Sequence, residues 1–116
     1  MIDVSKLTVD DEITDLVSGT HTYYLYPTDW TLAQFESEEY YTENYGKVVG
    51  MCIEKWISPS GETWLYVSPT CEVYDLFTNS VEYSDVDWYD LDPNTLDDRA
   101  RKYFGLTAEK GETQND

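Results

Sequence analysis

The sequence predicts a small single domain of the α+β class, with an antiparallel sheet of three to five strands and two or three short helices. Its 116 residues, 41% of them hydrophobic, suffice for one buried core. The middle of the chain contains two β-rich runs around a Pro and Gly turn, and helix-capping patterns stand on either side. We expect one acidic domain over residues 1–106 and a flexible polar tail over residues 107–116.

The first expected element is a short helix, capped by Thr8 and ended by Gly19. Its first turn contains three acidic residues, which suit the positive end of a helix dipole: Asp10, Asp11 and Glu12. Its inward stripe would consist of three apolar residues at helical spacing: Ile13, Leu16 and Val17. A strand rich in Thr and Tyr is expected next, over residues 21–26, and Pro27 ends it.

A second helix is expected before Gly46, because Thr31 and Gln34 resemble a capping box. Four residues supply its partly apolar face: Leu32, Phe35, Tyr40 and Tyr41. The opposite face is acidic, as is typical of the solvated side of a helix: Glu36, Glu38, Glu39 and Glu43.

The clearest local signal is a β-hairpin formed by residues 47–57 and 62–68, with Ser-Pro-Ser-Gly as the turn. In the second run, Trp64 and Tyr66 share one face. The opposite face contains the residues that alternate with them: Thr63, Leu65 and Val67. Pro69 is expected to end this strand.

Two further β segments and a last helix complete the prediction. Residues 71–77 alternate as a third strand, and residues 81–91 form either an acidic edge strand or an ordered loop. Asn94 or Thr95 caps the last helix, which Gly105 ends. Its inward residues are expected to be Leu96, Ala100, Tyr103 and Phe104.

Charge is the most informative feature for function. The chain has 24 Asp and Glu against seven Lys and Arg, a formal net charge of −17. Residues 72–98 contain nine carboxylates and no base, interleaved with five aromatic residues: Tyr74, Phe77, Tyr83, Trp88 and Tyr89. A disordered acidic tail would lack such aromatics, so we expect a folded acidic surface that attracts a basic partner. The alternative is that acidity only supplies solubility.

We expect the acidic run to form the binding site. If either half is extended, Asp85 and Asp87, or Asp90 and Asp92, project from one face about 6.6 Å apart, similar to successive phosphates on one strand. Basic side chains that bind a phosphate backbone could bind such a carboxylate ladder. An edge strand with charges on its open side is the competing interpretation. The predicted partner-binding residues are Glu72, Asp75, Glu82, Asp85, Asp87, Trp88, Tyr89, Asp90 and Asp92.

No catalytic or metal site is expected. His21 is the only imidazole and lacks a nucleophile motif, and the six glycines form no phosphate-binding loop. Calcium could use the aspartates of residues 85–92, but Trp88 stands near the position of the turn glycine and Leu96 replaces the final glutamate of an EF-hand. Neither a cofactor nor a metal is therefore predicted. Cys52 and Cys71 are expected to be reduced thiols.

The N-terminal residues have no signal-peptide pattern. The sequence also contains no apolar run of membrane-spanning length, so a cytoplasmic protein is expected. In size and composition the chain resembles small acidic proteins, often from phages or mobile elements, that mimic nucleic acid to block restriction, CRISPR or repair enzymes. This resemblance is to a functional class and includes no specific motif.

The leading hypothesis is a non-enzymatic inhibitor that binds a basic nucleic-acid-binding protein, not nucleic acid itself or a membrane. An immunity-type partner of one basic toxin, a structural or assembly protein, and a small hydrolase or calcium module are the alternatives, and a homodimer stays possible.

Overall fold

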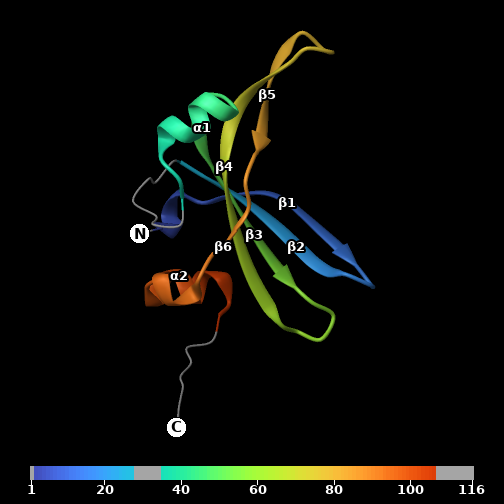
Figure 1. Cartoon of the computed structure of the whole chain (residues 1–116). Helices are drawn as coiled ribbons and strands as arrows, with labels where there is room; N and C mark the ends of the chain where they lie inside the picture. Colours follow the sequence, from blue (N-terminus) through green and yellow to red (C-terminus); the bar gives the residue numbers. More distant parts are fainter. Residues whose placement is uncertain (1, 28–34, 107–116) are drawn as a thin grey trace.

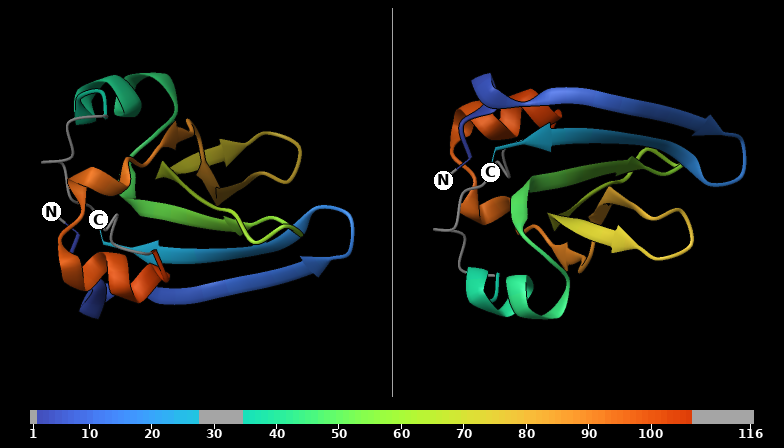
Figure 2. Two further views of the ribbon diagram at one scale, coloured as in Figure 1. Left: turned by 90° about the horizontal axis from the view of Figure 1, so that it is seen from below. Right: turned by 90° about the horizontal axis from the view of Figure 1, so that it is seen from above.

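The computed structural model describes residues 2–27 and 35–106. They form a small α+β domain in which a curled antiparallel sheet of five to six strands, a half-barrel, is combined with two short helices (Figures 1 and 2). The main path of the sheet is β1-β2-β3-β4-β5, and the short β6 pairs with β4. The strands are β1 Thr8–Asp15, β2 Gly19–Tyr26, β3 Val48–Ile57, β4 Thr63–Asp75, β5 Ser80–Asp85 and β6 Tyr89–Asp90. The helices are α1 Glu38–Asn44 and α2 Asp98–Phe104, and the 3-10 turns are η1 Val4–Lys6 and η2 Pro93–Thr95.

The prediction of a first helix is wrong, because Thr8–Asp15 is the edge strand β1, paired with β2. The three apolar residues of the predicted helical stripe do not share one element, because Ile13 lies in β1 whereas Leu16 and Val17 lie in the turn that follows it. A bulge between Val9 and Asp11 also interrupts the strand. The segment therefore lacks the regular alternation that is typical of a strand.

The predicted strand at residues 21–26 is confirmed as part of β2, and the predicted central hairpin is confirmed as β3 and β4. Pro69, however, does not end the second strand, and β4 continues to Asp75 through most of the predicted third strand. The Pro69 carbonyl accepts a hydrogen bond from Val86 N at 3.2 Å. In an antiparallel strand the nitrogen and the carbonyl oxygen of one residue point to the same side. The Pro69 nitrogen therefore points toward the gap between β5 and β6, where β4 has no ladder partner, so the missing N–H group removes no ladder hydrogen bond.

Residues 81–91 divide into two strands. Residues 80–85 form the edge strand β5, all of it exposed, and only Tyr89–Asp90 pair again with β4 as β6. The predicted edge strand is therefore present as β5, and the chain leaves the β4 ladder between β5 and β6.

Both helices begin later than predicted. Ser37 caps α1, and its Oγ accepts a hydrogen bond from Tyr40 N at 3.2 Å, whereas Thr31 and Gln34 lie outside the described residues. Asp97 caps α2. The predicted cap residues Asn94 and Thr95 belong to the separate turn η2, which Asp92 caps. Gly105 ends α2 in the left-handed conformation (φ 77°), as predicted.

One face of the sheet carries the main core. Its sheet residues are Tyr24, Tyr26, Met51, Ile53, Leu65 and Val67. They pack against residues from the two ends of the chain: Ile2, Val4, Leu91, Leu96, Ala100 and Phe104. Tyr103, predicted to face inward, is 41% exposed and touches the Tyr24 ring only at its edge. A second cluster beneath α1 joins Tyr41, Val48 and Cys71.

The helices α1 and α2 have seven residues each, and no helix within the described part of the chain is long and apolar enough to cross a membrane.

Candidate protein-binding surface

Four of the nine predicted site residues lie together on the β4–β5 hairpin, which projects beyond the helices (Figure 1). Glu72 lies opposite Tyr83, and Glu82 lies opposite Val73, so the two glutamates are on opposite faces of the hairpin. Asp85 ends β5, where one of its oxygens accepts a hydrogen bond from Thr70 Oγ1 at 2.8 Å. Both faces of this hairpin are therefore acidic.

Asp87, Tyr89 and Asp92 instead make bonds within the domain. The Tyr89 hydroxyl lies 2.9 Å from Asp87 Oδ2 and 2.8 Å from the Tyr41 hydroxyl, and its ring packs against both core clusters. Burial and these hydrogen bonds raise the pKa of Tyr89. Asp92 accepts a hydrogen bond from Asn94 N at 2.9 Å as the cap of η2. Asp87 and Asp92 are therefore each engaged by neighbouring groups of the domain.

Asp90 and Trp88 remain accessible on the outer side of β6. Asp90 lies opposite Tyr66, on the sheet face opposite the main core, and Trp88 is 42% exposed. Tyr89, predicted together with Trp88 to bind the partner, is half-buried and packs against both core clusters.

Among the described residues, the carboxylates of this surface have no basic partner. Within residues 2–27 and 35–106, the single ion pair joins His21 and Glu54, and no Lys or Arg lies within ion-pair distance of an Asp or Glu. The negative field of the edge strands is therefore not neutralised inside the described part of the domain.

The two edge hairpins share one turn geometry, in which an aspartate at the end of a strand binds two backbone N–H groups. Asp15 Oδ1 accepts hydrogen bonds at 2.6 and 3.1 Å from Val17 and Ser18. Asp75 Oδ1 accepts them at 2.8 and 3.4 Å from Phe77 and Thr78. These backbone bonds lower the pKa of Asp15 and of Asp75. Asp75, a predicted partner-binding residue, thus has a structural role at this turn.

The turns hold apolar side chains in solvent. The exposed fractions are 97% and 87% for Leu16 and Val17, and 83% and 101% for Leu76 and Phe77. These exposed apolar pairs at the two hairpin tips are candidate contact sites. They were not among the predicted site residues, but the repeated pattern Asp-Leu-apolar-Ser/Thr-Gly/Asn at residues 15–19 and 75–79 could have identified them.

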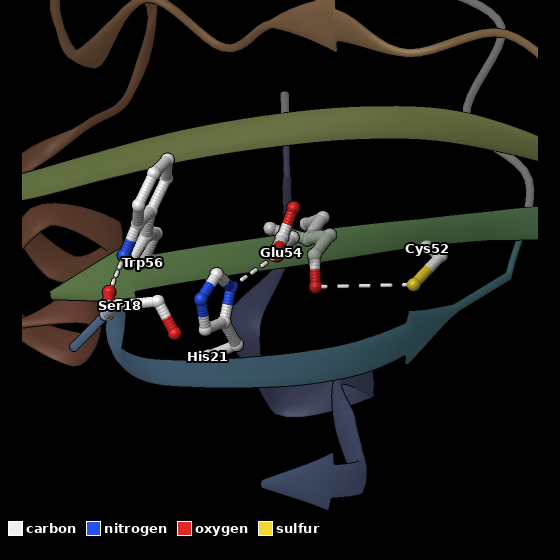
Figure 3. Close-up of polar contacts among 6 residues, drawn as sticks. Ser18, His21, Cys52, Glu54 and Trp56 are labelled. Atoms are coloured by element: carbon white, nitrogen blue, oxygen red, sulfur yellow. Dashed lines mark hydrogen bonds and ion pairs between the residues drawn. The ribbon is translucent and has the colours of Figure 1, made fainter. Parts of the chain in front are cut away.

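The uncovered face of the sheet contains a row of ring side chains that the strand register aligns. His21, Trp56 and Trp64 lie opposite one another on β2, β3 and β4. The His21 and Trp56 rings are stacked at 5.0 Å, and the Trp56 and Trp64 rings lie 5.5 Å apart. Figure 3 shows His21 directed toward Glu54, whose Oε2 lies 2.7 Å from its Nδ1. Trp56 donates its indole N–H to the Ser18 carbonyl oxygen at 2.5 Å (Figure 3).

Cys52, on the same strand as Trp56, is not an activated thiol. Burial, with Asp85 and Asp10 nearby, raises the pKa of Cys52 to about 12, and its sulfur donates to the Ile53 carbonyl oxygen at 3.9 Å. Burial also raises the pKa of Cys71. Both cysteines are free and buried. In the described ranges, no group of three or more His, Cys, Asp or Glu side chains is arranged to hold a metal ion.

Comparison of the chain with known proteins finds no matching family model, no matching curated protein and no matching solved structure.

Proposed function

We propose that this domain is a non-enzymatic inhibitor that mimics nucleic acid and occupies the nucleic-acid-binding site of a basic defence or repair enzyme. The supporting observation is the projecting β4–β5 hairpin, whose carboxylates have no basic partner in the described residues and whose tip presents apolar side chains. A surface built to bind phosphates would be attracted to these carboxylates. A role in blocking restriction, CRISPR or repair enzymes, in the cytoplasm of a host cell, is part of this proposal.

The two kinds of side chain would act at different stages of binding. The carboxylates of the hairpin and of β1 attract the partner at long range, so they raise the association rate, and salt reduces this effect. Leu76 and Phe77 are short-range contacts whose burial slows dissociation and is much less sensitive to salt.

An immunity-type partner of one basic toxin would use the same surface against a narrower target, so the identity of the captured protein separates it from a broad mimic. A structural or assembly protein would instead use the exposed tips for contacts between copies. Stable self-association in solution would favour this third function.

The experiment is an affinity capture from bacterial lysate with tagged protein, washed first at low and then at high salt, with mass spectrometry of the bound proteins. A test variant removes four accessible charges: Glu72→Gln, Glu82→Gln, Asp85→Asn and Asp90→Asn. A control variant removes four charges from the α1 region: Glu36→Gln, Glu38→Gln, Glu39→Gln and Glu43→Gln.

We expect salt-sensitive enrichment of a DNA- or RNA-acting enzyme. This enrichment should be lost in the test variant and retained in the control variant, because the two variants have the same net charge and differ only in where the charges are removed. Equal loss in both variants would mean that only total charge matters and would contradict a defined site. Recovery of the protein itself and no other would favour the assembly function.

A further inference from the structure

A depression of about 280 Å³ lies on the uncovered face of the sheet, outside the acidic hairpin. Its lining residues come from β2, β3, β4 and the segment before β6: His21, Glu54, Trp56, Tyr66 and Trp88. Four of these five residues carry rings, and the fifth is the only carboxylate.

The chemistry of this depression favours a cation with a flat, apolar surface. The faces of Trp and Tyr rings attract cations through their quadrupole, most strongly at Trp. Glu54 is held by His21, and its side chain is 17% exposed. A carboxylate has about four lone-pair positions, so the hydrogen bonds from His21 and Tyr23 leave others free for a ligand. A purely apolar ligand would bury the remaining lone pairs of this carboxylate without a donor, which is unfavourable.

Within this class, a guanidinium group fits better than an ammonium group. It is planar, stacks on aromatic faces and donates two parallel hydrogen bonds to one carboxylate, whereas lysine offers a compact, strongly hydrated charge. No Lys or Arg of the described chain occupies the site, since the ion-pair partner of Glu54 there is His21.

We infer that this depression binds the guanidinium group of an arginine side chain, with Trp56, Tyr66 and Trp88 as the stacking walls and Glu54 as the acceptor. The identification of this arginine as one belonging to the basic partner rests on the proposed function. The guanidinium site itself does not, and it can be tested without the partner.

The test is a titration of the purified protein with Nα-acetyl-arginine amide, followed by the NMR signals of the tryptophan indole N–H groups. Saturable shifts of the Trp56 and Trp88 signals are expected, with a dissociation constant on the order of 10 mM or tighter. Nα-acetyl-lysine amide has the same charge and is the matched control for simple attraction to an acidic protein. It is expected to bind several-fold more weakly.

Two variants locate the site. Trp88→Ala and Glu54→Gln are each expected to weaken arginine amide binding about tenfold, while Tyr83→Ala, at a 68% exposed ring on the edge strand β5, leaves it unchanged. Far-ultraviolet circular dichroism and melting curves establish that each variant is folded, and Glu54→Gln preserves the size of the side chain if Trp88→Ala does not fold.

Equal shifts with the lysine and arginine amides, or equal affinity of wild type and a folded Glu54→Gln variant, would overturn the guanidinium site. Failure of the lysate capture with a positive titration would remove the proposed function and leave this site intact. Success of the lysate capture with a negative titration would support the proposed function and remove the guanidinium site.

Discussion

The hydroxyl groups of Tyr41 and Tyr89 lie 2.8 Å apart and join α1 to β6, with Asp87 as a further acceptor for Tyr89. Removal of the Tyr89 hydroxyl in Tyr89→Phe deprives the Asp87 carboxylate of a donor and the Tyr41 hydroxyl of a partner. We expect the free energy of unfolding to fall by about 1–3 kcal/mol.

Urea denaturation measures this loss. Tyr83→Phe is the matched control, because Tyr83 is 68% exposed, and it should change stability by less than about 0.5 kcal/mol. Equal stabilities of the two variants would show that the Tyr41, Tyr89 and Asp87 contacts are not structural.

Gly19 is predicted to be intolerant of a side chain. It has φ +95°, and a Cβ there would lie 2.1 Å from the Ile57 carbonyl oxygen. Gly61 has φ +91° with nothing within 4 Å, so Gly61→Ala has the backbone strain without the clash. We expect Gly61→Ala to cost about 1 kcal/mol and Gly19→Ala at least about 2 kcal/mol more, measured by chemical denaturation. Similar losses would place Gly19 farther from β3 than described.

The two thiols should be unreactive in the folded protein. With the pKa of Cys52 near 12 and that of Cys71 also raised, alkylation by iodoacetamide at pH 8 should be slow until denaturant is added. The unfolded state loses its thiol protons first as the pH rises above the ordinary value of 9, so stability should fall between pH 9 and about 12. Rapid alkylation of Cys52 under native conditions would contradict its burial.

Leu76→Ser with Phe77→Ser separates anchoring from steering. Both side chains are almost fully exposed, so stability should change by less than about 0.5 kcal/mol. Once the partner is identified, surface plasmon resonance should show a dissociation rate increased about tenfold or more, with little change in the association rate. The four-charge variant should instead show a lower association rate, with little change in the dissociation rate. A double tip variant that binds like wild type would exclude this tip as an anchor.

The fold was predictable where local signals agreed with one another. The central hairpin combines β-rich runs with a Pro and Gly turn, and the end of α2 combines basic residues with a left-handed Gly105. β1 was not predictable in this way, because Ile13, Leu16 and Val17 have helical spacing although the last two lie in a turn, and three acidic residues resemble a helix start. Pairing with β2 across the sheet overrides this pattern.

The site was predictable only as charge. Composition indicates an acidic surface, but whether a carboxylate is free depends on contacts distant in sequence. The Tyr89 hydroxyl donates to Asp87, and that hydroxyl is also bonded by Tyr41, which lies 48 residues earlier on α1. The ring row on the uncovered face likewise needs the register of three strands, which the sequence of any one strand does not contain.

The most direct test of nucleic-acid mimicry is displacement of a fluorescently labelled oligonucleotide from the captured enzyme, followed by fluorescence anisotropy as this protein is added. We expect stoichiometric release of the oligonucleotide. Release should be weaker at high salt and with the four-charge variant, and as strong with the α1 control variant as with the wild-type protein. A ternary complex, in which anisotropy rises because enzyme, oligonucleotide and this protein bind together, would contradict it.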